Sequence, residues 1–338
     1  MITSKCKEAW PACRRIRLGL QNTNVETRRP IKLHRYHLSM TGVSKHVSTK
    51  ATCIIVNSVN QVGIISGSGL GDCLHKTFNC NNIVSRENAK NDFGYPSSDL
   101  YYGCIDGINI VLLSRHGEGH KINPTGVNYR ANIEALRLAG CTHVLASTAC
   151  GSLTESISRG QLIVPDSFID RTFARKATLY DGTSVKYNGV CHVPMEPAFD
   201  PRTSEILIQA AKKLGYNIRK GGTIVTIEGP RFSSKAESNA LRLWGGHLVS
   251  MTICPEVFLA KEAGLLYAAV AMATDYDCWR DCEDNVNAAD VLVVFKQNVD
   301  KMTNVLLETV KIIGSGEWKQ DILKLKDLIE TSNMTVKN

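Results

Sequence analysis

Residues 266–277 read LYAAVAMATDYD, and this stretch decides the fold because eight uncharged residues run without interruption into Thr274, Asp275 and Asp277. An apolar run of this length, bounded by polar residues, is typical of a strand that is buried on both faces. Such strands occur in largely parallel or mixed sheets that are covered by helices. The sequence therefore predicts an α/β fold with two carboxylates at the end of a central strand.

Outward from this strand, short β-branched runs alternate with helical patterns along the chain. The further strands that we expect are residues 62–66, 101–104, 108–113, 143–147, 161–164, 224–227 and 247–251. The expected helices are 127–138, a segment capped by Asp200 and ended by Gly215, one with a capping box at 234–237 and an end at Gly245, one near Pro255, and 288–313. We predict a mixed central sheet with helices on both faces.

Three loops follow or join these strands. Asp106-Gly107 lies between two apolar runs and is typical of a β-hairpin turn. A glycine loop, GSGLG, occupies residues 67–71, and the segment TACGS at 148–152 is expected to be a turn. Polar groups gather at strand ends in sheets of this kind, so these loops are candidate ligand sites.

The formal net charge of +8 is concentrated near the N-terminus. Residues 1–50 contain eleven Lys and Arg against two acidic residues, which leaves a net charge of −1 for the rest of the chain. A nucleic-acid-binding protein needs basic and aromatic residues on its folded part, so this function is disfavoured. We predict that residues 1–55 are a basic, disordered extension and that residues 56–338 form one domain. An organelle presequence, contact with an acidic surface and a start at Met40 stay open for the extension.

The twelve cysteines are scattered, without the C-x-x-C pairs or Cys/His clusters of zinc sites. No secretory signal and no apolar run of about 20 residues for a membrane span are present. We therefore expect a soluble protein with reduced thiols, located in the cytoplasm and also in the nucleus.

Candidate anion-binding residues follow three of the predicted strands. Backbone amides and the Ser68 hydroxyl of the glycine loop can hold a phosphate, although an ordinary tight turn has the same features. Arg115 offers a fork of donors to a tetrahedral oxyanion, and His116 can add another donor. Thr148-Ala149 can add a hydroxyl and an amide. The alternatives are a solvated Arg-His pair, or a metal bound by His116 and His120 without a third ligand of suitable spacing.

Asp275 and Asp277 form a candidate acid at the end of the central strand. Two carboxylates at positions i and i+2 in a dry site repel each other, which favours one of them holding a proton. A protonated carboxyl can donate to N7 of a purine, and its neighbour can accept from an exocyclic amine. The alternative is a pair of solvated loop acids.

Taken together, these segments resemble the trimeric purine nucleoside phosphorylases, and within that class the S-methyl-5′-thioadenosine phosphorylases. The resemblance extends from about residue 62 to near the C-terminus. The matching stretches are GIISGSGL at 63–70, RHG at 115–117, VNYRANI at 127–133, TACGS at 148–152, TIEGPRFSS at 226–234 and MATDYDCW at 272–279.

The resemblance implies a nucleoside phosphorylase-like fold and a transferase, more narrowly a pentosyltransferase, of purine and methionine salvage. Its reaction would be the phosphorolysis of S-methyl-5′-thioadenosine to adenine and 5-methylthioribose 1-phosphate, with adenosine as a second candidate substrate. Inorganic phosphate would be the co-substrate, and no metal or organic cofactor is expected. The expected partners are the nucleoside, phosphate and further copies of the chain in a homotrimer, and neither a membrane nor nucleic acid.

The resemblance also gives roles to individual residues. Asp275 and Asp277 would be catalytic, with Asp275 placed to protonate N7. The expected phosphate-binding residues are Ser68, Arg115, His116, Thr148, Ala149 and Thr252. The expected substrate-binding residues are Ser233 at adenine, Phe232 near the base or sugar, Met251 under the ribose, and His192, Ala288, Val291 and Leu292 around the 5′-methylthio group, joined by Met334 from a neighbouring subunit.

Three positions depart from the family pattern. Ser68 and Met334 stand where a threonine and a leucine are usual, and Ala288 replaces a valine in the 5′ pocket. The nearest rival is a 6-oxopurine nucleoside phosphorylase, which would have a glutamate in place of Ser233 and an asparagine in place of Asp275. A serine cannot supply that carboxylate, so the adenine-specific function is favoured.

Overall fold

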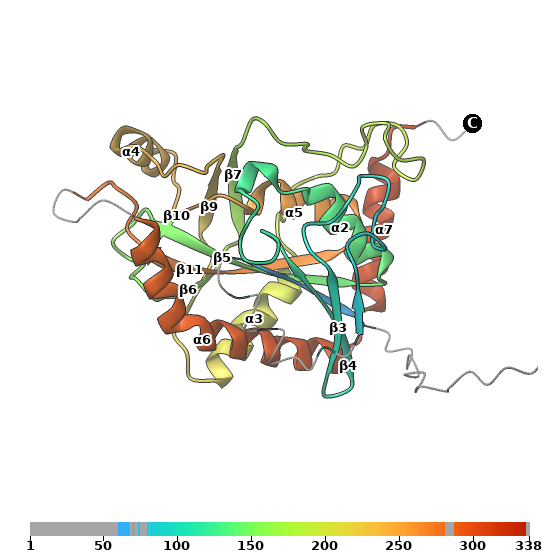
Figure 1. Ribbon diagram of the computed structural model, residues 1–338, viewed down its shortest axis with the longest axis horizontal. Helices are drawn as coiled ribbons and strands as arrows, with labels where there is room; N and C mark the ends of the chain where they lie inside the picture. Colours follow the sequence, from blue (N-terminus) through green and yellow to red (C-terminus); the bar gives the residue numbers. More distant parts are fainter. Residues whose placement is uncertain are drawn as a thin grey trace, which may run out of the picture. The chain divides into compact units, whose positions relative to one another are not determined.

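The described part of the chain is organised around one mixed sheet of eleven strands (Figure 1). The computed structural model describes residues 60–67, 70, 74, 80, 82–280 and 287–335. The predictions for the extension at 1–55 and for Ser68 lie outside these residues. The sheet runs β2-β3-β4-β1-β5-β10-β9-β7, and β11 joins β5 to β6, which in turn pairs with β8.

The bounds of the strands agree with most of the expected segments. The predicted strands are present as β1 (Val62–Ser66), β3 (Leu100–Ile105), β4 (Ile108–Ser114), β5 (His143–Ser152), β6 (Leu162–Val164), β9 (Thr223–Ile227), β10 (Leu248–Ser250) and β11 (Leu266–Asp275). Three strands were not predicted: β2 (Asn82–Val84), β7 (Ser167–Arg171) and β8 (Ile218–Lys220).

The predicted turn at residues 148–152 is wrong, because strand β5 continues to Ser152. Strand β11 pairs in parallel with β5 as far as Asp275 opposite Gly151, while β10 pairs in antiparallel fashion with Gly151 and Ser152. Small residues and a glycine suggested a turn. The segment instead forms hydrogen bonds with two neighbouring strands, β10 and β11, which are distant in the sequence. Gly151 is required here because a Cβ atom would lie 2.8 Å from Asp275 Oδ1.

Both faces of the central strands are buried, as the sequence predicts. In β11 the alternate residues Tyr267, Ala269, Ala271 and Ala273 belong to one core cluster, and Leu266, Ala268, Val270 and Met272 belong to the other. The hairpin of β3 and β4 is also confirmed, since Asp106 and Gly107 both have positive φ angles, 49° and 83°, as a tight hairpin turn requires.

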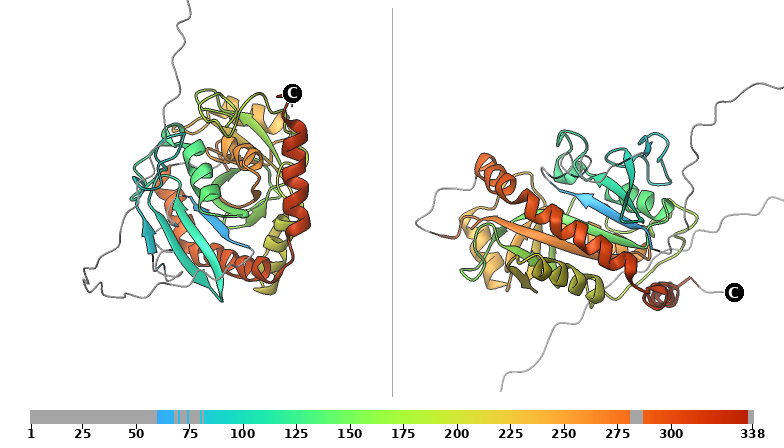
Figure 2. Two further views of the ribbon diagram at one scale, coloured as in Figure 1. Left: turned by 90° about the vertical axis from the view of Figure 1, so that its right-hand side faces the viewer. Right: turned by 90° about the horizontal axis from the view of Figure 1, so that it is seen from below.

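Helices cover the sheet on both sides. The first core cluster contains residues of α2 (Tyr129–Leu138) and α5 (Ile253–Glu262), and the second contains residues of α3 (Pro201–Lys213) and α6 (Ala288–Ser315). Figure 1 shows the two pairs on opposite sides of the sheet, and Figure 2 shows α6 running along one side of it. The mixed α/β fold with helices on both faces is confirmed.

The helix caps follow the local signals in the sequence. The Asp200 side chain accepts from Thr203 N at the start of α3, and α4 (Lys235–Leu243) has the capping box of Ser234 and Glu237. Two helical elements were not predicted, the short 3-10 turn η1 (Pro124–Gly126) and α7 (Lys319–Ser332). Among the described residues, no helix is long and apolar enough to span a bilayer.

Candidate active site

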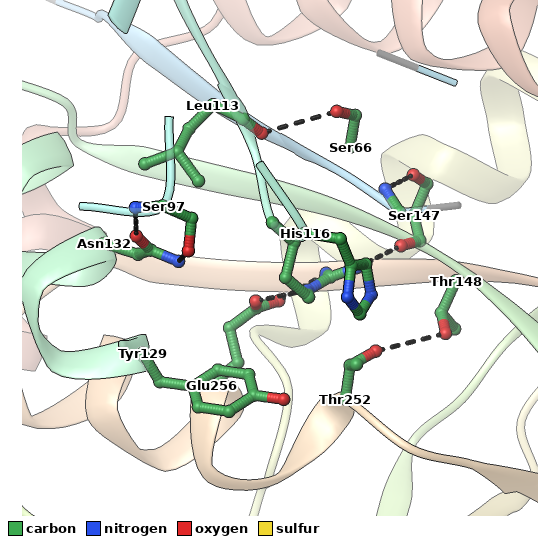
Figure 3. A network of polar contacts seen from close by, with 12 residues as sticks. Ser66, Ser97, Leu113, His116, Tyr129, Asn132, Ser147, Thr148, Thr252 and Glu256 are labelled. Carbon is green, nitrogen blue, oxygen red and sulfur yellow. Dashed lines mark hydrogen bonds and ion pairs between the residues drawn. The ribbon is translucent and has the colours of Figure 1, made fainter. Parts of the chain in front are cut away.

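The site lies where four parallel strands end. Strands β4, β1, β5 and β11 run in the same direction, so their carboxyl ends share one edge of the sheet. This edge brings Arg115 after β4 close to Ser147 of β5, and it places Asp275 at the end of β11. Figure 3 shows three of the candidate residues, His116, Thr148 and Thr252, near one another at this edge.

Arg115 is fully buried and fixed by a bidentate ion pair. Its Nε and Nη2 atoms donate to the two carboxylate oxygens of Glu256 on α5, both at 2.7 Å, and Nη1 donates to Ser147 O at 2.9 Å. Glu256 also accepts from the Tyr267 hydroxyl at 2.8 Å. Burial alone would lower the pKa of Arg115, but the Glu256 carboxylate outweighs it and holds the pKa above its usual range. A guanidinium has five N–H groups, and the described residues accept from three of them.

Gly67 makes this close packing possible. A Cβ atom at Gly67 would lie 2.7 Å from Ser147 O and 3.1 Å from Arg115 Nη1. The Gly67 amide donates to Ser147 Oγ at 3.0 Å, so the first residue of the glycine loop is tied to β5. Ser68, the predicted phosphate ligand in this loop, lies outside the described residues.

His116 is buried and held in one tautomer. Its Nδ1 atom lies 2.9 Å from Ile122 O, and because a carbonyl only accepts, Nδ1 carries the proton. Burial, with the positive charge of Arg115 next in importance, lowers the pKa of His116 to about 3. The ring is therefore neutral with an unprotonated Nε2, and the role of His116 as a phosphate-binding residue stays a prediction.

The metal alternative for His116 and His120 gains no support from the geometry. Their ring centroids lie 4.3 Å apart. Within the described residues, however, no group of three or more His, Cys, Asp or Glu side chains could hold a metal ion.

Two threonine hydroxyls complete the polar cluster around Arg115 and His116. Thr148 Oγ1 and Thr252 Oγ1 lie 3.5 Å apart, and Figure 3 shows them on the same side as the His116 ring. Thr252 occupies the N-cap position of α5, yet its side chain makes no capping hydrogen bond. Ala149 follows on β5 and is half-buried. The structure thus brings together the described members of the predicted phosphate site.

Arg175 fixes the neighbouring loops, and the sequence analysis missed it. Its side chain is 1% exposed, and Nη1 donates to Met251 O and Cys254 O, both at 2.7 Å. Nε donates to Glu228 Oε1 at 3.0 Å, and Nη2 donates to Glu228 O at 2.6 Å. This arginine therefore positions Met251, the residue expected under the ribose. Arg175 lies in a segment without a recognisable motif, so no sequence signal pointed to it.

Glu228 is the acceptor at the centre of the same network. Burial alone would raise its pKa, but hydrogen bonds from Phe173 N, the Thr125 hydroxyl and Ala174 N, together with Arg175, lower it to about 2. The following Gly229 has a φ angle of 69°, and a Cβ atom there would lie 2.6 Å from Met251 Sδ. The backbone before Phe232 and Ser233 is thereby packed directly against Met251, while Phe232 itself is 38% exposed.

The two candidate acids are buried in different surroundings. Asp275 Oδ1 accepts from Asp277 N and Asp275 Oδ2 accepts from Thr274 Oγ1, both at 2.8 Å. The hydroxyls of Ser238 and Ser233 lie beside Asp277 and, as hydrogen-bond donors to its carboxyl, oppose the rise in its pKa that burial causes. Burial raises the pKa of both carboxyls, so mutual repulsion is not the main cause. Asp277 and the two serines therefore form a polar cluster next to Asp275.

The predicted 5′-pocket residues fall into two separate groups. Ala288, Val291 and Leu292 lie on the first two turns of α6. His192 N donates to Ser332 O at the end of α7, and Met334 N donates to Val190 O, so His192 and Met334 lie together. Figure 1 shows the start of α6 and the end of α7 at opposite ends of the molecule. His192 therefore lies away from Val291 and Leu292 within one chain, and the 5′ pocket that joins them stays a prediction.

Comparison with known proteins agrees with this architecture. A family model described as the phosphorylase superfamily matches residues 61–311. The chain is 54% identical over 275 residues to S-methyl-5′-thioadenosine phosphorylase from Aedes aegypti, which covers 81% of this chain and 96% of that protein. It is 48% identical over 279 residues to S-methyl-5′-thioadenosine phosphorylase from Xenopus tropicalis, covering 82% of this chain and 98% of that protein.

Solved structures show the same likeness. Methylthioadenosine phosphorylase from Schistosoma mansoni in complex with adenine has a TM-score of 0.77 and 39% identity, covering 82% of this chain and 100% of that chain. A variant of adenosine/methylthioadenosine phosphorylase from the same organism, in complex with methylthioadenosine, has a TM-score of 0.76 and 39% identity, with 82% and 100% coverage. The chain belongs to the phosphorylase superfamily, and within it to the family of the S-methyl-5′-thioadenosine phosphorylases.

Proposed function

We propose that the chain catalyses the phosphorolysis of S-methyl-5′-thioadenosine to adenine and 5-methylthioribose 1-phosphate. One observation carries this function. At one edge of the sheet, the polar side chains around Arg115 that can bind an anion lie on the same side as the buried carboxyls of Asp275 and Asp277. Relatives named as phosphorylases of this nucleoside, and structures of relatives with methylthioadenosine and adenine, support the same substrate.

At the phosphate end, the residues position the nucleophile. The N–H groups of Arg115 that no described residue accepts and the Thr252 hydroxyl are donors for phosphate oxygens. The Thr148 hydroxyl donates to Ala149 O at 3.0 Å in this structure and would turn to the phosphate when it binds. Cleavage of an N-glycosidic bond builds positive charge on the sugar, as in other oxocarbenium-like reactions. A phosphate held beside C1′ stabilises that charge and attacks the same carbon. Met251, fixed by Arg175, lies under the ribose in this proposal.

At the base end, the residues assist the departure of adenine. Asp275 protonates N7, and the Asp277 carboxyl with the neighbouring Ser233 hydroxyl hydrogen-bonds the purine. Burial raises the pKa of Asp275, which increases the fraction that carries a proton near neutral pH. Ser233 offers no carboxylate for the N1–H of a 6-oxopurine, so adenine remains the favoured base.

The remaining proposals concern the surroundings of the reaction. Inorganic phosphate is the co-substrate, and the chemistry assigned to these residues needs no metal or organic cofactor.

The cysteines that the structure describes are all free thiols, which supports a reducing compartment such as the cytoplasm and nucleus. A homotrimer would bring the His192 and Met334 group of one subunit to the α6 group of its neighbour.

Steady-state kinetics on methylthioadenosine, adenosine and inosine with phosphate tests the function directly. We expect kcat/KM to be lowest for inosine, because Ser233 and Asp275 recognise adenine. Adenosine should rank below methylthioadenosine, because its 5′ hydroxyl loses hydration in an apolar 5′ pocket. Turnover of inosine at the rate of methylthioadenosine would contradict the assignment.

Replacing the proposed acid gives a sharper test. Asp275→Asn should lower kcat for methylthioadenosine by about 10²- to 10⁴-fold, because an amide cannot protonate N7. The amide oxygen can still accept from Asp277 N, so the fold should persist. Asp277→Asn is the matched comparison and should raise KM more than it lowers kcat, since it loses an acceptor. A kcat of Asp275→Asn within a few-fold of the wild type would end this role.

The 5′ selectivity is tested by Ala288→Val on the first turn of α6. The two added methyl-sized groups should favour the methylthio group over the adenosine hydroxyl, because a hydroxyl in an apolar pocket loses hydration without a partner. The expected shift in the kcat/KM ratio is about tenfold toward methylthioadenosine, the range of one methylene in an apolar pocket. Lys296→Ala, an exposed change further along α6, is the control and should leave the ratio unchanged.

Subunit complementation tests the proposed assembly. Asp275→Asn and Met334→Glu should each be poorly active alone, because one lacks the acid and the other places a charge at the methylthio group. Co-refolded mixtures should regain activity at about a quarter of the sites, as random mixing of subunits predicts. Mixed oligomers without any gain in activity would show that both residues act within one chain.

A further inference from the structure

The tautomer of His116 determines which hydrogen bond it can make with an oxyanion. Nδ1 donates to Ile122 O at 2.9 Å, which leaves a lone pair on Nε2 of the neutral ring. His116 is only 6% exposed, and Thr148 and Thr252 lie nearby in the same cluster. An oxyanion bound in this cluster therefore meets donors from Arg115 and the threonines, but an acceptor at His116.

The charged and titratable groups around His116 keep it neutral. Arg115 precedes it in the chain, His120 stacks at 4.3 Å between ring centroids, and Arg175 contributes a further positive charge. All three disfavour a second proton on the ring, as does burial, and its pKa is lowered to about 3. The two buried carboxylates nearest this cluster are engaged elsewhere, Glu256 by Arg115 and Glu228 by Arg175.

We propose that His116 Nε2 accepts a hydrogen bond from a protonated oxygen of the co-substrate, so that the site selects oxyanions that carry a proton. This inference rests on the proposed function, because it concerns the same phosphate site. Hydrogen phosphate has one O–H group for Nε2 and three unprotonated oxygens for Arg115, Thr148 and Thr252. When hydrogen phosphate binds, the proton stays on the phosphate, and no protein group has to gain or lose one.

Sulfate is the natural probe of this arrangement, because it has the size and charge of hydrogen phosphate but no proton near neutral pH. One of its oxygens would face the lone pair of Nε2, so sulfate binds only when the ring takes a proton from solvent. Sulfate affinity should then rise about tenfold for each unit by which the pH falls, as the linkage of one proton requires. Arsenate carries a proton as phosphate does and should replace it.

The test measures sulfate as a competitive inhibitor against phosphate between pH 6.5 and 8.5 at constant ionic strength. At pH 8 the sulfate Ki should exceed the phosphate KM by about tenfold or more, the worth of one hydrogen bond to a charged partner. The Ki should fall by about tenfold per pH unit toward acid, whereas arsenate should support turnover with a KM within a few-fold of that for phosphate. Equal competition by sulfate at pH 8 without pH dependence would overturn the proposal.

A matched pair of variants separates His116 from its neighbour. In His116→Gln the side-chain amide can donate to an unprotonated oxygen, so sulfate should compete within a few-fold of phosphate and lose its pH dependence. His120→Gln removes the stacked ring but leaves Nε2 of His116 unchanged, and it should keep the wild-type discrimination. Retention of sulfate discrimination in His116→Gln would contradict the role of Nε2.

Calorimetric titration keeps the test independent of turnover and of these variants. Binding of sulfate to the wild-type protein should take up about one proton per site from the buffer, and binding of phosphate at pH 8 should take up none. Absence of phosphorolysis with any nucleoside would contradict the proposed function alone. Sulfate binding without proton uptake would contradict the role of His116 alone.

Discussion

The buried ion pair between Arg115 and Glu256 is the interaction on which the site depends. It joins the end of β4 to α5 in a region where neither side chain has any exposed surface. Removing one partner of such a pair leaves an uncompensated buried charge and typically costs about 3–5 kcal/mol. The fixed guanidinium explains the surrounding choices: Gly67 has no side chain, and Tyr267 satisfies a carboxylate oxygen. Its charge is also a cause of the neutral His116 ring.

The same arrangement limits the net charge offered to the co-substrate. Arg115 is balanced by Glu256 and Arg175 by Glu228, so the two buried arginines act largely as oriented hydrogen-bond donors. Under the proposed function, the balanced charge of the site suits both phosphate binding and product release, since the sugar phosphate product is an anion that must leave. Two unpaired arginines would hold a phosphate more tightly and slow product release. Selectivity among oxyanions must then come from the positions of hydrogen-bond donors and acceptors. In our proposal the His116 tautomer contributes to it by presenting an acceptor at Nε2.

Local chemistry could be predicted from the sequence, and long-range partners could not. The β11 pattern, the Asp106-Gly107 hairpin and the capping box at Ser234 rely on neighbours in sequence, and the structure confirms all three. Glu256 pairs with Arg115 from 141 positions away, and no local pattern shows it. The turn expected at 148–152 failed for the same reason, because β10 and β11 supply the ladder. The direction of the His116 hydrogen bond was equally hidden, since it depends on the carbonyl of Ile122.

Under the proposed function, the residues that bind the base and the phosphate lie apart from those that bind the 5′ substituent. Arg115, Asp275 and Asp277 are positioned by strands of one sheet, where ladders and buried contacts fix each side chain. Ala288 and Leu292 at the start of α6 and Met334 beyond α7 are exposed in the single chain, Met334 by 64%. Apolar side chains this exposed gain little binding energy for a methylthio group unless a second surface covers them. In the proposed trimer that surface is the neighbouring subunit, so substitutions at the boundary between subunits can alter 5′ selectivity while the bond-breaking residues keep their geometry.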